Sequence, residues 1–226
     1  MCTTAERFSE ELHRETSGIW DAIFRHPFLA ELVDGTLPLE SFRYFVAQDY
    51  RYLEAFGRAV AMALAKAPDG PTMRRLSARV ITPIERPLHT RLFELVGLTI
   101  EEVEALEPAP TNLGYMNHML ATAALGDLGT TAAALLPCPW TYHTIGERLA
   151  ELGTPRHPVY AEWASFYTSG MLAESTNAWR ALVDDFGAVA GPPLREAMRR
   201  AFIRSSRYEY LFWDAAYGRE EWPGRG

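Results

Sequence analysis

The sequence predicts an all-α protein. In most segments the apolar residues recur at helical spacings, and no segment alternates apolar and polar residues as a half-buried strand does. Turn residues separate the periodic segments. The nearest thing to a domain boundary is the Pro-rich loop around 107–111, and helical segments continue on both sides of it. We therefore expect one multi-helix domain over 1–226, with its core at about 5–218.

The first two expected helices lie near the start of the chain. Phe8, Leu12, Ile19 and Ile23 fall at spacings of four or seven, so they share one face of a first helix. The segment HPFLAEL predicts a short second helix. The following DGTLP contains a glycine and then a proline, which is typical of a turn.

Two longer helices are expected next. The first runs from about Leu39 to Lys66, with Pro38 near its first turn and APDGP at its end. The second is expected over Thr72 to Val96, with a possible kink at Pro83 or Pro87 because proline removes a backbone hydrogen bond.

The remaining segments are also periodic. LTIEEVEAL predicts a short helix opened by Thr99, and a helix near Leu113 to Ala124 follows the loop EPAPTN. Another helical segment contains LLPCPWTYHTIGERLAEL. The last two long helices are expected near Pro158 to Phe186 and Leu194 to Tyr217, separated by FGAVAGPP.

Composition excludes several classes of protein. The net charge of -7 does not favour binding to nucleic acid or to an anionic membrane, which attract basic proteins. No apolar stretch approaches the roughly 20 residues of a membrane helix, and the N-terminus has no signal-peptide pattern. The two cysteines, Cys2 and Cys138, are too few for a disulfide framework. These features predict a soluble, cytoplasmic protein with free thiols.

Cys138 is the first candidate for chemistry. Pro137 and Pro139 bracket it within a helical run, so the helix must kink or restart there. If the helix restarts, Cys138 lies at a helix N-terminus, where a thiolate is favoured, and Tyr142 shares its face. The alternative is a buried, inert cysteine beside a proline kink.

A second candidate lies in QDYRYL. Asp49 and Tyr52 are spaced i,i+3 and share a helix face. An aspartate among aromatic rings must be paired, hydrogen-bonded or protonated. Such a site suits an aminoheterocycle, because the rings stack on it and the carboxylate accepts from its amino group. The alternative is a solvated helix face with Asp49 paired to a neighbouring arginine.

The third candidate is Glu209 in the aromatic segment RYEYLFWD, where it is spaced i,i+3 from Phe212. Apolar burial raises the pKa of a carboxyl group toward the range of a useful general acid. So many aromatic residues on one helix are also typical of a core.

Glu85 and His89 form a possible metal-binding pair at i,i+4 spacing. A di-iron site would need matching carboxylate and histidine ligands from several helices, and no histidine follows His157. We therefore interpret the pair as hydrogen-bonded and expect no metal. The chain has no glycine-rich phosphate-binding motif and no C-x-x-C.

Together these segments resemble one family. The ordered set QDYRYL, ERPLH, LGYMNHML, LLPCPWTY, EWASFY and RYEYLFWD is similar to the thiaminase II (TenA) family, from about Phe8 to Tyr217. The resemblance implies a haem-oxygenase-like helical bundle, a homotetramer and no cofactor. It also implies hydrolysis of the bond between an aminopyrimidine methylene and a nitrogen leaving group, in thiamin salvage. The leaving group is the thiazolium of thiamin or ammonia from an aminomethylpyrimidine.

The resemblance also implies roles for particular residues. Cys138 corresponds to the nucleophile, Glu209 to the glutamate on a ring nitrogen, and Asp49 to the aspartate that holds the exocyclic amine. The remaining matches are three hydrogen-bonding tyrosines (Tyr52, Tyr142 and Tyr167) and two stacking aromatics (Tyr115 and Phe212).

Two features leave alternatives open. Pro139 stands where the family resemblance leads us to expect a larger residue after the cysteine, and a proline there can change the direction in which the thiol points. Relatives of the same fold include metal-dependent oxidases, which Glu85 and His89 would suit. A non-catalytic protein that binds thiamin or a pyrimidine is the other alternative.

Overall fold

The computed structural model describes residues 6–80 and 86–224, and within these ranges the chain is all-α, with helices and no strand. The helices are α1 (Phe8–Glu15), α2 (Ser17–Phe24), α3 (Pro27–Asp34), α4 (Leu39–Ala65), α5 (Gly70–Val80), α6 (Arg86–Val96), α7 (Ile100–Ala105), α8 (Pro110–Leu125), α9 (Leu128–Leu135), α10 (Pro137–Leu152), α11 (Pro158–Thr168), α12 (Leu172–Val189) and α13 (Pro192–Gly218).

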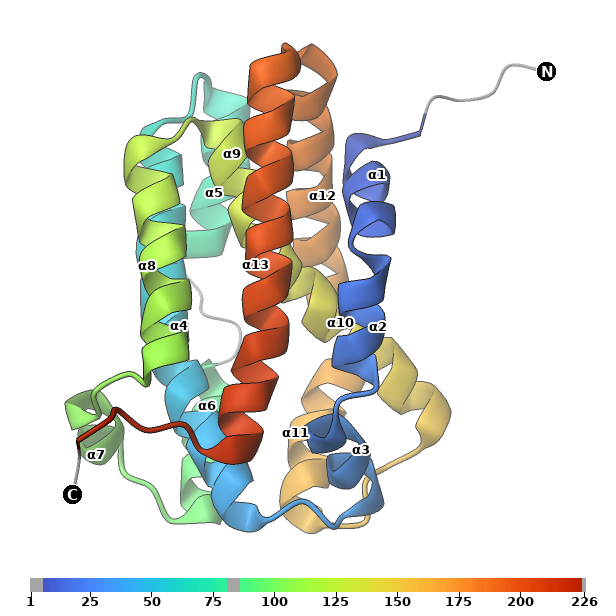
Figure 1. Cartoon of the computed structure of the whole chain (residues 1–226), viewed down its shortest axis with the longest axis vertical. Helices are drawn as coiled ribbons and strands as arrows, with labels where there is room; N and C mark the ends of the chain where they lie inside the picture. The colour runs from blue at the N-terminus through green and yellow to red at the C-terminus, as the bar shows by residue number, and fades with distance from the viewer. Residues whose placement is uncertain (1–5, 81–85, 225–226) are drawn as a thin grey trace.

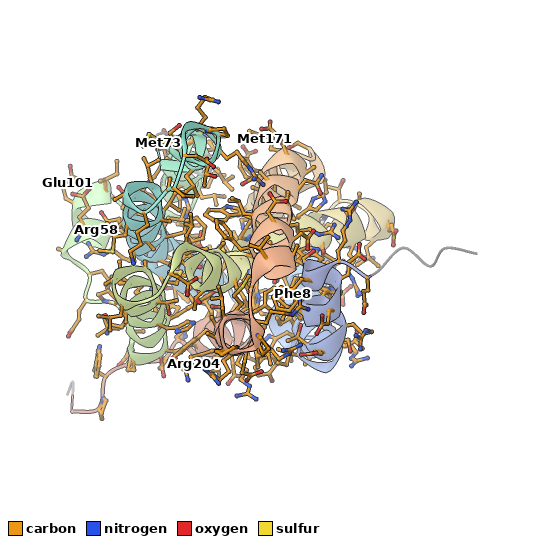
Figure 2. All side chains as sticks on the ribbon, turned by 90° about the horizontal axis from the view of Figure 1, so that it is seen from above. Phe8, Arg58, Met73, Glu101, Met171 and Arg204 are labelled. Atoms are coloured by element: carbon orange, nitrogen blue, oxygen red, sulfur yellow. The ribbon has the colours of Figure 1, made fainter. Side chains whose placement is uncertain are left out.

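The bundle is built around α4 and α13, the two longest helices. Helix α13 packs against α4, α8 and α9, and α4 packs against α5 and α8 (Figure 1). Seen from above, side chains fill the space between the helices, whereas the exposed Arg58, Glu101 and Arg204 lie on the outside (Figure 2). The inward faces of α4, α8, α10 and α13 therefore meet in the interior.

The expected first helix is divided in two. Thr16 separates α1 from α2, and its hydroxyl donates to the backbone oxygens of Leu12 and His13. This bonding to the preceding turn competes with helix continuation and bends the chain. Phe8, Leu12 and Ile23 are buried, whereas Ile19 is only half-buried. The prediction of a single helix was wrong here.

The expected helix over 158–186 is also divided. Helix α11 ends at Thr168 and α12 begins at Leu172. Between them Gly170 has a φ of 76°, which glycine adopts without the penalty that other residues meet. The other expected helices are present with small shifts in their ends: α8, for example, begins at Pro110 because proline fits the first helical position.

The segment expected as one helix over 72–96 forms α5 and α6. Residues 81–85, including Pro83 and Glu85, lie outside the described residues, as does Cys2. Pro87 is the second residue of α6 and does not kink it. Among the described residues, no helix combines the length and the apolar character that crossing a membrane requires.

Three histidines, one buried and two half-buried, are expected to make the stability of the fold depend on pH. Burial is the main cause that lowers the pKa of His13, His26 and His118, and the pKa of His118 falls to about 4. The unfolded chain takes up protons on these rings near pH 6.5, before the folded chain does. The free energy of unfolding should therefore fall as the pH drops from about 6.5 toward 4.

We expect a lower melting temperature at about pH 5 than at about pH 7.5, and a smaller difference in His118→Asn. Melting curves of both proteins at both pH values measure this. The prediction would be contradicted by an identical pH dependence in the variant.

Candidate active site

Six side chains from four helices line one small cavity. Its lining consists of Asp49 and Tyr52 of α4, Tyr115 of α8, Tyr142 of α10, and Glu209 and Phe212 of α13. All six are candidates from the sequence. The cavity is small, and its empty volume of about 170 Å³ includes space that is open to solvent.

Helical spacing brings these residues inward in pairs. Asp49 and Tyr52 are one turn apart on α4, and Glu209 and Phe212 are one turn apart on α13. All four side chains are buried. Since α4 and α13 pack against each other, the two pairs face the same cavity.

Glu209 is held by Tyr115 across the cavity. The Tyr115 hydroxyl donates to Oε1 of Glu209 at 2.6 Å, a bond between residues 94 positions apart in the chain. The Tyr115 ring is stacked on Tyr208, with ring centroids 5.2 Å apart. Glu209 is only 3% exposed, so this carboxyl group is a buried acid with a fixed orientation.

Asp49 is held by His89 of α6. Nε2 of His89 lies 3.0 Å from Oδ2 of Asp49, and both side chains are buried. The alternative of a solvated Asp49 paired to an arginine is therefore wrong. The partner expected for His89, Glu85, lies outside the described residues. No local pattern predicted the Asp49–His89 contact, because it joins positions 40 residues apart.

Three phenols keep their protons in this cluster. Burial raises the pKa of Tyr52, Tyr115 and Tyr142 well above the usual value, and nearby Cys138 and Glu209 raise each further. The phenols therefore remain neutral hydrogen-bond donors near pH 7. The buried Tyr52 hydroxyl lies beside the Tyr115 hydroxyl, although among the described residues it makes no hydrogen bond of ordinary geometry.

Cys138 lies in the first turn of α10, beside the cavity. Pro137 is the first residue of the helix, and Leu136 joins it directly to α9, so the helix restarts as one of the sequence alternatives predicts. Prolines fit this turn because its N–H groups have no partner within the helix. Pro139 is accommodated there, and its carbonyl accepts from Thr176 at 3.0 Å. Cys138 is 8% exposed, and it lies close enough to the three phenols to raise the pKa of each.

Tyr167 packs against Tyr142, one of the six residues that line the cavity. Its ring centroid is 5.2 Å from that of Tyr142, and it is buried. Gly146 allows this approach, because a Cβ at that position would lie 2.3 Å from the carbonyl oxygen of Tyr167. Helices α10 and α11 therefore touch backbone to backbone beside Tyr142.

Gly146→Ala is expected to force α11 away from α10 and to destabilise the fold by about 1–3 kcal/mol, as overpacked cores do. Gly57→Ala is the matched control, since a Cβ at Gly57 of α4 meets nothing within 4 Å. The control should gain about 0.5–1 kcal/mol from helix propensity. Urea denaturation measures both, and equal stability of the two variants would contradict the close contact.

His89→Leu is expected to destabilise the fold by about 1–3 kcal/mol, because it leaves the buried carboxylate of Asp49 without this donor. His143→Leu is the control. Its partner, Glu147, is largely exposed, so we expect a loss below about 0.5 kcal/mol. Chemical denaturation of both variants compares the two contacts. A loss in His89→Leu no larger than in the control would contradict the buried pair.

Within residues 6–80 and 86–224, no group of three or more His, Cys, Asp or Glu side chains is arranged to hold a metal ion.

Comparison with known proteins places the chain in a family. Residues 13–219 match the model of the TENA/THI-4/PQQC family. The chain is 34% identical to the aminopyrimidine aminohydrolase of Bacillus subtilis, over 96% of this chain and 92% of that protein. It superposes on the TenA homologue of P. horikoshii OT3 with a TM-score of 0.83 and 34% identity, covering 94% and 99% of the two chains.

A more distant structure shows the fold. A domain with a heme oxygenase-like fold from Shewanella denitrificans has a TM-score of 0.73 at 13% identity, covering 92% of this chain and 91% of that one. The fold expected from the sequence is thereby confirmed as an all-α, haem-oxygenase-like bundle. The chain belongs to the TENA/THI-4/PQQC family.

Proposed function

We propose that this protein is an aminopyrimidine aminohydrolase (thiaminase II), a hydrolase that acts on C–N bonds in thiamin salvage. The observation that supports this most strongly is the cavity itself. It combines a buried carboxyl group held by a phenol, a second carboxylate held by a histidine, and aromatic walls, with a cysteine beside it. The relatives named aminopyrimidine aminohydrolase support the same activity.

The pyrimidine is proposed to bind between aromatic side chains. Tyr115 and Phe212 would contact the ring faces, and Asp49 would accept a hydrogen bond from the exocyclic amine. His89 orients Asp49 through the 3.0 Å contact. The Tyr52 hydroxyl, which is buried beside the Tyr115 hydroxyl, is a donor that the ligand can satisfy. Because the cavity is small and open to solvent, the leaving group would project from it.

The proposed chemistry begins with addition. The Cys138 thiolate, stabilised by the N-terminus of α10, forms a C–S bond to a ring carbon while Glu209 gives a proton to a ring nitrogen. Protonation makes the ring an electron sink and lowers the barrier to addition. The adduct then expels the amine or thiazole from the methylene.

Water completes the reaction. It adds to the methylene carbon and gives up one proton to the released amine or to solvent. The C–S bond then breaks to return the thiolate, and the ring nitrogen returns its proton to Glu209. The net reaction consumes one water and releases hydroxymethylpyrimidine and the nitrogen leaving group. The three neutral phenols would hold the charged intermediates by hydrogen bonds without taking part in the proton balance.

The test is turnover of two substrates. The folded protein is incubated separately with thiamin and with aminomethyl-aminopyrimidine, and hydroxymethylpyrimidine is followed by chromatography. Formation of this product from either substrate is expected. Tight binding of both without turnover would favour the non-catalytic alternative and contradict hydrolysis. Turnover that depends on stoichiometric iron or manganese would favour the oxidase alternative.

We also propose a cytoplasmic homo-oligomer, a tetramer by resemblance to the family. Exposed apolar side chains on helices support subunit contacts, among them Leu125, Leu152 and Val189. Light scattering of the purified protein measures the assembly, and a monomer at micromolar concentration would contradict it.

A further inference from the structure

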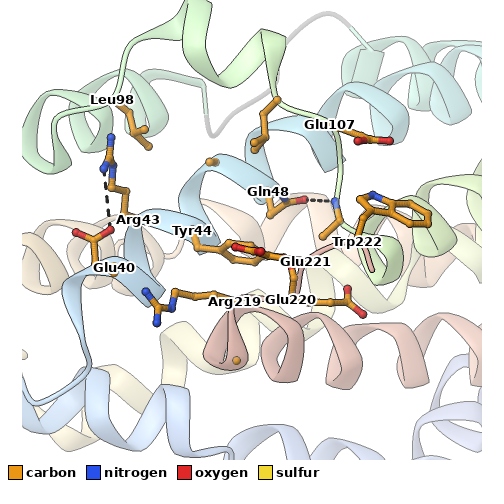
Figure 3. A pocket seen from close by; sticks show the side chains of 14 residues that line it. Glu40, Arg43, Tyr44, Gln48, Leu98, Glu107, Arg219, Glu220, Glu221 and Trp222 are labelled. Atoms are coloured by element: carbon orange, nitrogen blue, oxygen red, sulfur yellow. Dashed lines mark hydrogen bonds and ion pairs between the residues drawn. The ribbon is translucent and has the colours of Figure 1, made fainter. Parts of the chain in front are cut away.

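The segment that follows α13, Arg219–Trp222, crosses the lower end of the bundle from α13 toward the start of α8 (Figure 1). We call it the strap. Arg219 ends α13 with a φ of 54°, which turns the chain out of the helix. The strap then forms one side of a cleft that is also lined by α4 and the loop before α8 (Figure 3). None of its residues belongs to the candidate active site.

The strap is bonded to α8 by a carboxylate. Both oxygens of Glu220 accept from Thr111, one from the backbone N–H at 2.8 Å and one from the hydroxyl at 3.0 Å. Thr111 is the second residue of α8, where backbone N–H groups have no partner within the helix. Negative charge is favoured at that end of a helix, so Glu220 serves as the cap that α8 itself does not supply.

Two further bonds hold the strap in place. The Tyr44 hydroxyl of α4 donates to the backbone oxygen of Glu220 at 2.7 Å, and the Trp222 indole donates to the oxygen of Pro108 at 3.0 Å. The strap therefore connects α13, α4 and the start of α8. These three helices supply Glu209, Asp49 and Tyr115 to the cavity.

The loop that the strap holds is also bonded next to the active site. The side chain of Gln48, which precedes Asp49, accepts from Ala109 at 3.0 Å and from Asn112 at 2.8 Å. Asn112 lies one turn before Tyr115 on α8. The first turn of α8 is thus held from α4 on one side and from the strap on the other, one turn away from the phenol that bonds to Glu209.

We propose that the strap positions Tyr115 against Glu209, with Glu220 and Trp222 as positioning residues for the reaction. The inference rests on the proposed hydrolase activity. Loss of the Glu220 cap would let the first turns of α8 shift or fray and would lengthen the Tyr115–Glu209 bond. A misplacement of about 1 Å far from the chemistry can lower a rate up to 10²-fold.

Lys66 provides a matched control at the other end of α8. Its ammonium group donates to the backbone oxygens of Ala123 and Gly126, so it caps the helix C-terminus far from the strap. Lys66→Met should destabilise α8 at that end and leave the active site in place. Glu220→Ala and Lys66→Met therefore remove one cap each from the same helix.

Hydrogen exchange tests the structural part without using activity. In Glu220→Ala we expect faster exchange of the amides from Thr111 to Tyr115 and unchanged exchange in the last turn of α8. In Lys66→Met we expect faster exchange in the last turn of α8 and unchanged exchange from Thr111 to Tyr115. Unchanged exchange at Tyr115 in Glu220→Ala would overturn the proposal, whatever the enzyme does. Trp222→Phe, which removes only the bond to Pro108, provides the same readout if Glu220→Ala does not fold.

Kinetics test the functional part once wild-type turnover is measured. Glu220→Ala should lower kcat about tenfold with little change in KM, and Glu220→Gln, which keeps an acceptor, should recover most of it. In a Tyr115→Phe background, Glu220→Ala should lower kcat less than about twofold, because the Tyr115–Glu209 hydrogen bond that Glu220 supports is already absent. Lys66→Met should keep the wild-type kcat. A wild-type kcat in Glu220→Ala, or full additivity with Tyr115→Phe, would overturn the proposal; an inactive wild-type protein would instead contradict the proposed function.

Discussion

Replacing Cys138 with alanine is expected to lower the rate of aminopyrimidine hydrolysis at least about 10²-fold. The thiol lies in the first turn of α10 and beside three neutral phenols, which suits a nucleophile rather than an inert core cysteine. The alanine side chain has no atom that can form the C–S bond. Cys138→Ser should be similarly impaired, because a serine hydroxyl is a much weaker nucleophile than a thiolate without an adjacent base.

The measurement needs a binding control. Initial rates of the wild type and the two variants are compared at saturating substrate, and binding of hydroxymethylpyrimidine is measured by calorimetry. We expect binding within about threefold of wild type, since only the sulfur is changed and the cavity walls remain. Near-wild-type turnover in Cys138→Ala would show that Cys138 is not the nucleophile and that the reaction in this pocket proceeds by a different mechanism.

Replacing Glu209 with glutamine is expected to lower kcat about 10²–10⁴-fold, the usual contribution of a general acid. Glutamine has nearly the same shape, and its oxygen can still accept from Tyr115, so the packing of the site is preserved. What is lost is the proton that makes the ring an electron sink. The variant should bind the pyrimidine and fail to convert it.

Glu196→Gln is the matched control on the same helix. Glu196 is exposed and pairs with Arg199 and Arg200 on the surface, so its loss should change neither the rate nor the stability by much. Comparing kcat of the two glutamine variants measures what the buried carboxyl group contributes to the rate. Equal kcat values in Glu209→Gln and Glu196→Gln would show that the buried carboxyl group does not act as the acid.

Local sequence patterns predicted most of the helices and the inward faces of the site. The i,i+3 pairs of α4 and α13 each became one wall of the cavity, because residues one turn apart share a face in any helix. The proline pair around Cys138 predicted a kink or restart because proline lacks the N–H that a continuing helix needs. Such features depend on neighbours within a few residues, which a single sequence displays.

Features that depend on distant neighbours could not be predicted in this way. The Asp49–His89 and Tyr115–Glu209 contacts join different helices, and no spacing in the chain encodes which helices meet. The breaks at Thr16 and Gly170 lie in segments that remain apolar and periodic, so the pattern alone favoured continuation. Tyr167, which the resemblance matched to a hydrogen-bonding tyrosine, packs against Tyr142, a neighbour that no spacing in the chain indicated.

The most direct test is hydrolysis of aminomethyl-aminopyrimidine in water enriched in oxygen-18, with the wild type and Cys138→Ala in parallel. The wild type should release ammonia and hydroxymethylpyrimidine whose hydroxyl carries the heavy oxygen, and Cys138→Ala should release neither above about 1% of that rate. Product without the label, or labelled product from Cys138→Ala at the wild-type rate, would contradict hydrolysis by a Cys138 nucleophile.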